Sequence, residues 1–185
     1  MEVVKMSSYK IVDLDKIFVG DLRFVIYREE DYSDFLFIDA DLSGVNIKNI
    51  VMKRATFKRV IFEKSDLSMA DLSGSCFTSS CNFSGSKLIA ANLSEVDFFG
   101  TNFKGADLRG ANLKNAKLKS PRFEGADLRG ANLCGVKFDG ILCFDGANLT
   151  GAIMAKSALC NGSSNQDEAV KNAMDLFLSM GVIFV

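Results

Sequence analysis

The sequence repeats itself most clearly in the stretch Gly105-Ala106-Asp107-Leu108-Arg109-Gly110-Ala111-Asn112-Leu113, which returns 20 residues later as Gly125-Ala126-Asp127-Leu128-Arg129-Gly130-Ala131-Asn132-Leu133. Each stretch contains a five-residue unit, Ala-Asp/Asn-Leu/Phe-x-Gly, with a large apolar residue at its centre. In a helix, successive centres would rotate by about 140° around the axis. In a continuous strand, an odd period would flip each centre to the opposite face. The backbone must therefore turn once per unit, which predicts stacked coils spaced by about 4.8 Å.

The five-residue period covers most of the chain. From residue 35 onward, 25 successive units carry a large apolar centre, and a small residue such as Ala106 or Ala126 usually stands two positions earlier. We expect both positions to face a narrow core. The centres are Phe37, Leu42, Ile47, Met52, Phe57, Phe62, Leu67, Leu72, Phe77, Phe83, Leu88, Leu93, Phe98, Phe103, Leu108, Leu113, Leu118, Phe123, Leu128, Leu133, Phe138, Phe144, Leu149, Met154 and Leu159.

These units resemble the pentapeptide-repeat proteins over residues 35–160. The resemblance implies an all-β fold, a right-handed quadrilateral β-helix with four units per coil. Six coils would form a rod about 30 Å long. Two steps are six residues long, Phe77 to Phe83 and Phe138 to Phe144, and twelve units separate them. Both extra residues should lie at the same edge, either as tolerated bulges or as a shared partner-contact edge.

Composition argues against an enzyme. The 185 residues have a formal net charge of -1 and contain neither His nor Trp, so the usual general base and zinc ligand are missing. We expect no catalytic residues, no cofactor and no metal site. The cysteines are odd in number, lack a C-x-x-C pair and occupy positions of small residues elsewhere in the repeat, so they should be reduced fillers. They are Cys76, Cys81, Cys134, Cys143 and Cys160.

Neither a membrane span nor a signal peptide is expected, because no long uncharged apolar run occurs at the N-terminus or elsewhere. The prediction is a cytoplasmic protein, with secretion as an effector left open.

The Asp/Asn residue before each centre is expected to be structural. A residue type that recurs at every fifth position serves the repeat, and its side chain can bond the backbone of the turn. Asp107 and Asp127 should stack one coil apart, with Arg109 and Arg129 beside them to offset repulsion.

The surface charge points to a macromolecular partner. Residues 35–160 carry 16 basic and 12 acidic side chains, whereas residues 1–34 carry 5 and 8, and residues 161–185 carry 1 and 3. A basic stripe can be a solvated face or can meet an anionic partner surface. The candidate partner-binding residues are a basic group on one predicted face, Lys58, Arg59, Lys117, Lys119 and Lys137, and three outward apolar residues, Ile61, Ile89 and Phe99.

At the N-terminal end of the coils, residues 1–34 form either an N-terminal cap or degenerate coils, since Ile17, Leu22, Tyr27 and Tyr32 keep the five-residue phase. An open solenoid end exposes strand edges and apolar rings, so it requires a cover.

Residues 161–185 predict a short amphipathic α-helix, capped by Asn165 and Glu168 and stopped near Gly181, followed by a buried apolar tail. This segment caps its own coil, forms a two-fold dimer, or does both. The candidate dimerisation residues are Val170, Met174, Phe177, Met180, Val182 and Phe184. The helix and tail are similar to the C-terminus of Qnr-type quinolone-resistance and gyrase-inhibitor pentapeptide proteins, which implies a homodimer.

Two functions follow from these observations. The first is a non-enzymatic scaffold, regulator or effector that docks another protein along a β-helix face. The alternative, implied by the Qnr-type resemblance, is a DNA-mimicking binder of DNA gyrase or topoisomerase that gives quinolone or toxin resistance. A DNA mimic should present negative surface, whereas the coils carry excess positive charge. We expect no small-molecule substrate and no direct contact with nucleic acid.

Overall fold

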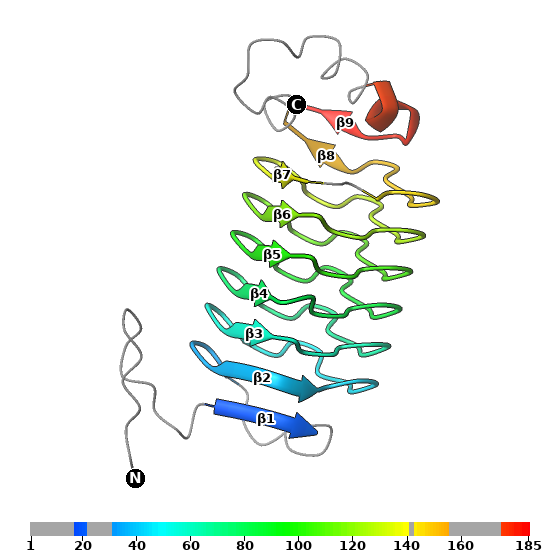
Figure 1. Ribbon diagram of the computed structural model, residues 1–185. Coiled ribbons are helices and arrows are strands. Elements are labelled where there is room, and N and C mark those ends of the chain that lie inside the picture. The colour runs from blue at the N-terminus through cyan, green and yellow to red at the C-terminus, as the bar shows by residue number, and fades with distance from the viewer. Residues whose placement is uncertain (1–16, 22–30, 141–142, 156–174) are drawn as a thin grey trace.

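The chain winds into a β-solenoid of about six turns, as the five-residue period predicts (Figure 1). The computed structural model describes residues 17–21, 31–140, 143–155 and 175–185. Successive coils lie one above the other along the axis of the rod, and each coil adds one strand to a parallel sheet.

One side of the solenoid carries the longest strands, which pair in chain order. Phe37 lies opposite Phe57, and Phe57 lies opposite Phe77, so one coil spans 20 residues, or four units. The pairing of Phe77 with Phe98 spans 21 residues because the first six-residue step lies in that coil. The strands of this sheet are β1 (Ile17–Asp21), β2 (Leu36–Asp41), β3 (Thr56–Lys58), β4 (Cys76–Thr78), β5 (Asp97–Phe99), β6 (Lys117–Lys119) and β7 (Lys137–Asp139).

The solenoid has four faces, each with its own ladder of parallel backbone pairs. Face A is the sheet β1–β7. Face B follows the ladder Asp41, Ile61, Asn82, Asn102, Arg122 and Cys143. Face C follows Asn46, Asp66, Lys87, Asp107, Asp127 and Asn148. Face D follows Asp31, Val51, Asp71, Asn92, Asn112, Asn132 and Ile153. The four ladders confirm four units per coil.

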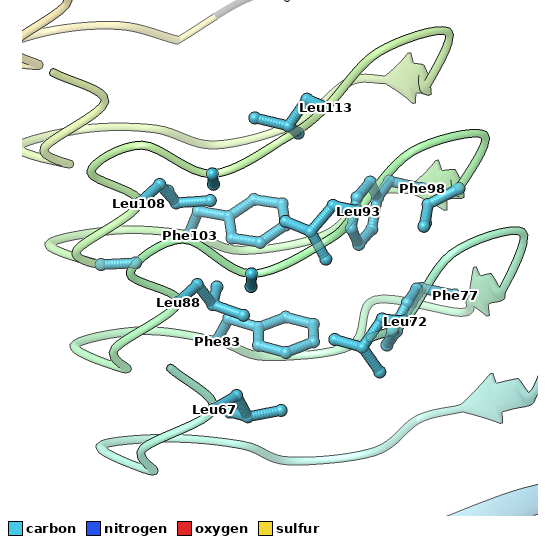
Figure 2. Packing of buried hydrophobic residues seen from close by; sticks show 14 of the residues in the cluster. Leu67, Leu72, Phe77, Phe83, Leu88, Leu93, Phe98, Phe103, Leu108 and Leu113 are labelled. Atoms are coloured by element: carbon cyan, nitrogen blue, oxygen red, sulfur yellow. The ribbon is translucent and has the colours of Figure 1, made fainter. Parts of the chain in front are cut away.

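The unit centres form the core, and Figure 2 shows them pointing into the space between the faces. Every described centre is buried except Phe144, which is half-buried. Aromatic rings stack from coil to coil. On face B, Phe62 stacks on Phe83 with ring centroids 4.6 Å apart, and Phe83 stacks on Phe103 at 5.3 Å. Such stacked pairs stabilise the solenoid beyond the area they bury.

The corners adopt the left-handed backbone region, which explains the glycines of the repeat. Gly110 has φ of 65° at a corner where an added methyl group would meet no atom within 4 Å. At the equivalent corners Met69 (φ 61°) and Ala90 (φ 55°) take the same conformation at a steric cost. Ser79 and Ser80 both have positive φ and form the first six-residue step, at the corner between faces A and B. The second step leaves Phe138 of face A at that same corner, although residues 141–142 lie outside the described residues.

The N-terminal strand shows a register that the sequence pattern did not predict. In β1, Phe18 lies opposite Phe37, and Ile17 lies opposite Leu36. The five-residue phase counted from Ile17 is therefore displaced by one residue, and the register shifts between Val19 and Gly20. Tyr32 is fully buried, in agreement with its expected phase. Leu22 and Tyr27 lie outside the described residues.

The C-terminal end covers the last coil. Residues 175–179 are helical and end at Gly181, whose N–H donates to the carbonyl of Leu178 while the N–H of Val182 donates to that of Phe177. This pair of bonds is a Schellman stop, with buried Val182 and Phe177 as its hydrophobic contact. The phenyl ring of Phe177 packs 6.2 Å from that of Phe138.

The tail forms strand β9 (Ile183–Phe184), which pairs in parallel with β8 (Ile153–Met154) and extends face D. Asn165, Glu168, Val170, Ala173 and Met174 lie outside the described residues, as does Cys160.

Replacing one ring of the stacked column tests the core. We expect Phe83→Ala to lower the free energy of unfolding by about 3–5 kcal/mol, because the buried ring leaves a cavity between two stacked neighbours. The adjacent outward substitution Ser84→Ala should change it by less than about 0.5 kcal/mol. Urea unfolding of both variants measures the difference, and a similar small loss for both would contradict the packing.

Candidate protein-interaction surface

Three of the four faces use the residue before the centre to hold their own turns. On face B the N–H of Ser43 donates to Oδ1 of Asp41 at 2.8 Å, and the same bond recurs on faces C and D. This confirms the structural role expected for the Asp/Asn row. The accepting residues are Asp31, Asp41, Asp66, Asp71, Asn82, Asn92, Asn102, Asp107, Asn112, Asp127, Asn132 and Asn148.

Face C contains the predicted carboxylate pair and its neutralising arginines. Asp107 and Asp127 are paired one coil apart. The guanidinium of Arg129 lies 2.7 Å from Asp127, and that of Arg109 lies 2.8 Å from Asp107 and 4.0 Å from Asp127. The hydrogen bond from Arg129 lowers the pKa of Asp127 below its ordinary value, with the backbone N–H and the arginine charges adding to the effect. In-register like charges are thus compensated within the coil stack.

Face A is different, because none of its described residues before a centre accepts this turn bond. The outward positions on β3–β7 vary in chemistry instead. The column before the centres reads Thr56, Cys76, Asp97, Lys117 and Lys137, and the column after them reads Lys58, Thr78, Phe99, Lys119 and Asp139. The face therefore passes from mostly uncharged side chains at β3 and β4 to charged side chains at β6 and β7.

A shallow groove of about 260 Å³ lies across β5–β7 on face A. The ammonium of Lys117 lies 3.5 Å from the carboxylate of Asp97, and that of Lys119 lies 3.5 Å from Asp139. Lys119 also lies over the ring of Phe99, 5.3 Å from its centroid. Phe99 is 50% exposed, which is unusual for an aromatic residue in the part of the chain that the structure describes. The groove is lined by Asp97, Lys117, Leu118, Lys119, Lys137 and Asp139.

The candidate contact residues do not form one surface. Lys117, Lys119 and Lys137 line the groove, and Phe99 lies beside it under Lys119, whereas Lys58 lies three coils before Lys119 on the same face. Arg59 is at the following corner and forms an ion pair with Asp39 at 2.5 Å.

The apolar candidates separate further. Ile61 lies on face B and is 40% exposed, and Ile89 lies on face C and is less exposed than Ile61. Sequence reasoning grouped them because all point outward, but the four-sided section places them on different faces.

The described dimerisation candidates point mainly into the protein's own last coil. Phe177 and Val182 are buried, and Met180 and Phe184 pack partly against the core. The side chains that alternate with them are exposed instead: Leu176, Leu178, Ile183 and Val185. Sequence reasoning missed these residues because it assigned the inward stripe of the helix to the partner.

The described cysteines are free thiols and fill space. Cys81 is fully buried, and burial raises its pKa to about 11, which keeps the thiol protonated and unreactive at neutral pH. Among residues 17–21, 31–140, 143–155 and 175–185, no group of three His, Cys, Asp or Glu could hold a metal ion. In the same ranges, no helix has the length and hydropathy that crossing a membrane requires.

Replacing the paired carboxylate on face C should give a pH-dependent loss of stability. Because the folded pKa of Asp127 lies below its unfolded value, the ion pair stabilises the protein at neutral pH and stops doing so as pH falls below about 4. Asp127→Asn, which keeps the turn bond, should cost up to about 1 kcal/mol at pH 7 and progressively less toward pH 3.

Urea unfolding across this pH range measures the difference between the Asp127→Asn variant and the unmodified protein. The control is Asp145→Asn, which alters an exposed carboxylate that forms no ion pair with any described residue. A cost for Asp127→Asn that grows as pH falls would contradict the assignment.

Several solved structures are similar to this chain. The pentapeptide repeat protein Rfr23 from the cyanobacterium Cyanothece 51142 is 29% identical, with a TM-score of 0.50 over 62% of this chain and 86% of that chain. HetL from Nostoc sp. strain PCC 7120, described as involved in heterocyst differentiation regulation, is 20% identical over 76% and 74% of the two chains, with a TM-score of 0.43. QnrB1, a plasmid-mediated fluoroquinolone resistance protein, is 16% identical over 75% and 87%, with a TM-score of 0.36.

Among curated proteins, none matches this chain in sequence. The sequence pattern of the pentapeptide repeats, by contrast, matches in eight copies over residues 37–78, 79–115 and 111–141. These segments cover more than half of the chain and coincide with the coils whose four ladders were described above. The chain therefore belongs to the pentapeptide repeat family.

Proposed function

We propose that this protein is a non-catalytic binding module that docks another protein on face A. The observation that carries the proposal is that the outward side chains of face A do not hold the turns of the repeat. On faces B, C and D most residues before a centre accept the turn bond, as in Asp41, Asp107 and Asn112, although a minority such as Ile61 and Lys87 do not. On face A the described side chains at that position have no such duty.

The chemistry of face A suits a protein partner. Protein interfaces favour aromatic anchors surrounded by polar groups. The half-exposed ring of Phe99, with Lys119 above it and Asp97 in the same strand, supplies this combination. Parallel strands also hold these side chains on a rigid backbone, so that little conformational entropy is lost on binding.

A scan of the four faces tests this proposal. Lys119→Glu on face A should lower capture of a specific partner from native cell extract by at least about tenfold, since charge reversal in an interface costs binding free energy. The matched changes Lys104→Glu, Lys87→Glu and Lys114→Glu reverse one charge on faces B, C and D and should leave capture within about twofold.

Quantitative mass spectrometry of the captured proteins measures these ratios, with circular dichroism to show that each variant is folded. A partner that is lost on one of the other three variants, and retained by Lys119→Glu, would move the interface away from face A.

Binding of DNA gyrase is the second candidate function, which the charges of the surface support less well than docking of a protein on face A. A mimic of duplex DNA needs continuous negative surface, but the described faces alternate acids with bases, as in the pairs Lys48–Asp66 and Lys53–Asp71. A supercoiling assay with purified gyrase and micromolar protein distinguishes the two functions. Inhibition of supercoiling, or protection of the enzyme from a quinolone, would favour the gyrase alternative.

We also propose that the C-terminal end forms a two-fold homodimer through its exposed stripe rather than through the inward residues. Leu178 and Ile183 are each more than half exposed beside the last strand, and apolar side chains gathered at a strand edge favour association. The double change Leu178→Glu and Ile183→Glu should convert a micromolar dimer to monomer.

Light scattering after size exclusion measures the mass of each variant. Ile61→Glu, which introduces the same charge at an exposed isoleucine on face B, should leave the dimer intact. A monomeric unmodified protein would contradict the proposal.

A further inference from the structure

We infer that the groove on face A recognises a side-chain carboxylate of an acidic segment in the partner protein, held between Lys117 and Lys137. This inference rests on the proposed function, because it specifies what face A binds. The pairing of β6 with β7 places these two lysines directly opposite each other.

Two like charges in register on adjacent strands repel each other. The strand spacing holds the backbones of these two residues about 4.8 Å apart, so both flexible side chains can reach one carboxylate placed between them. Asp97 neutralises Lys117 from the β5 side at 3.5 Å. Lys137 forms no ion pair with any described residue. Along β5–β7, the column before the centres therefore places one acid, Asp97, next to two bases, Lys117 and Lys137.

On face C, like charges that are in register are neutralised by side chains of the protein itself. There Asp107 and Asp127 are in register, and Arg109 and Arg129 contact them at 2.7–4.0 Å. In the Lys117–Lys137 pair only Lys117 has a counter-charge, that of Asp97, and Lys137 forms no ion pair with any described residue. A carboxylate placed between the two ammonium groups would supply it and would extend the alternation begun by Asp97.

The side chains around the groove favour a ligand that carries an apolar residue near its carboxylate. Beside the groove, the exposed ring of Phe99 lies under Lys119, which is one of the lining residues, and an apolar side chain can pack on the exposed part of the ring. The ligand class is therefore an acidic peptide segment in which glutamate or aspartate stands near an apolar residue.

The acids of the groove argue for a peptide over a nucleic acid. Asp97 and Asp139 flank the three lysines, so the groove carries only one excess positive charge. Closely spaced phosphates would bring negative charge against both aspartates, whereas a peptide can present one carboxylate at the lysine pair alone. Nucleic-acid affinity depends on many phosphate contacts, which this surface does not provide.

The direct experiment uses the full chain and a fluorescein-labelled peptide in which glutamate and leucine alternate. Fluorescence anisotropy at low salt measures binding. We expect Lys117→Gln and Lys137→Gln each to weaken binding by about fivefold or more, in line with the loss of one charged hydrogen bond. Lys114→Gln, which removes an exposed charge from face D, should change affinity by less than twofold, and a peptide with glutamine for glutamate should bind as weakly as the variants.

Three results would overturn the inference: no binding of the acidic peptide at millimolar concentration, equal weakening by Lys114→Gln, or tighter binding of a DNA duplex than of the peptide through the same two lysines. These results are separate from a failure of the proposed function. If the face scan places the partner on face A while the peptide ignores Lys137, only this inference fails. If the peptide depends on Lys137 while the partner maps to another face, the proposed function fails.

A second variant provides a readout that needs no ligand. Lys137→Glu would place a carboxylate next to Lys117 and complete the alternation inside the protein. We expect it to raise the melting temperature by about 1–3 °C while abolishing peptide binding. Lys114→Glu should not raise the melting temperature, and a fall caused by Lys137→Glu would show that the two lysines are not short of a counter-charge.

Discussion

The structure depends on a backbone that turns after every fifth residue. Each turn allows the centre and the small residue before it to face the same narrow interior, and each coil then lies in hydrogen-bonding register with the next. The N–H of Leu108 donates to the carbonyl of Asp127 at 2.7 Å, and that of Leu113 to Asn132 at 2.8 Å. Stacking of rings such as Phe62 and Phe83 follows from this register and would be lost if one coil slipped by a residue.

The same constraint divides the surface into committed and free positions. Most units on faces B, C and D use Asp or Asn to hold their turns, so the repeat fixes much of the outward chemistry there, with exceptions such as Ile61 and Arg122. Face A is built of three-residue strands from β3 to β7, and its outward side chains are released from that duty. A rigid scaffold whose outward side chains vary most freely on one face suits recognition more than catalysis. The family supplies the fold, and we propose that the function resides in the side chains placed on that face.

Much of the fold could be predicted from the sequence because the five-residue repeat constrains the residue types in every unit. The centres, the small row and the role of Asp107 and Asp127 all follow from spacing. The four-sided section did not follow from spacing and was implied only by family resemblance. Without knowledge of the four-sided section, Ile61 and Ile89 could be grouped with Phe99, although the three residues lie on different faces. With it, the 20-residue separation of Lys117 and Lys137 would have placed them in register.

The ends were harder to predict because the repeat no longer constrains them. In β1 the register shift at Gly20 moves Phe18, and not Ile17, into line with Phe37. At the C-terminus the helix pattern identified Phe177 as apolar and periodic. Periodicity alone cannot distinguish a side chain that covers its own coil from one that meets a second copy. The packing of Phe177 on Phe138 settles that question for this residue.

The central claim is the pairing of residues about 20 positions apart, and scalar couplings across hydrogen bonds measure it most directly. In uniformly labelled protein, the amide nitrogen of Leu108 should couple to the carbonyl carbon of Asp127, and that of Leu113 to Asn132. Couplings from these amides to carbonyls three or four residues earlier in the chain would indicate helical turns and would contradict the solenoid.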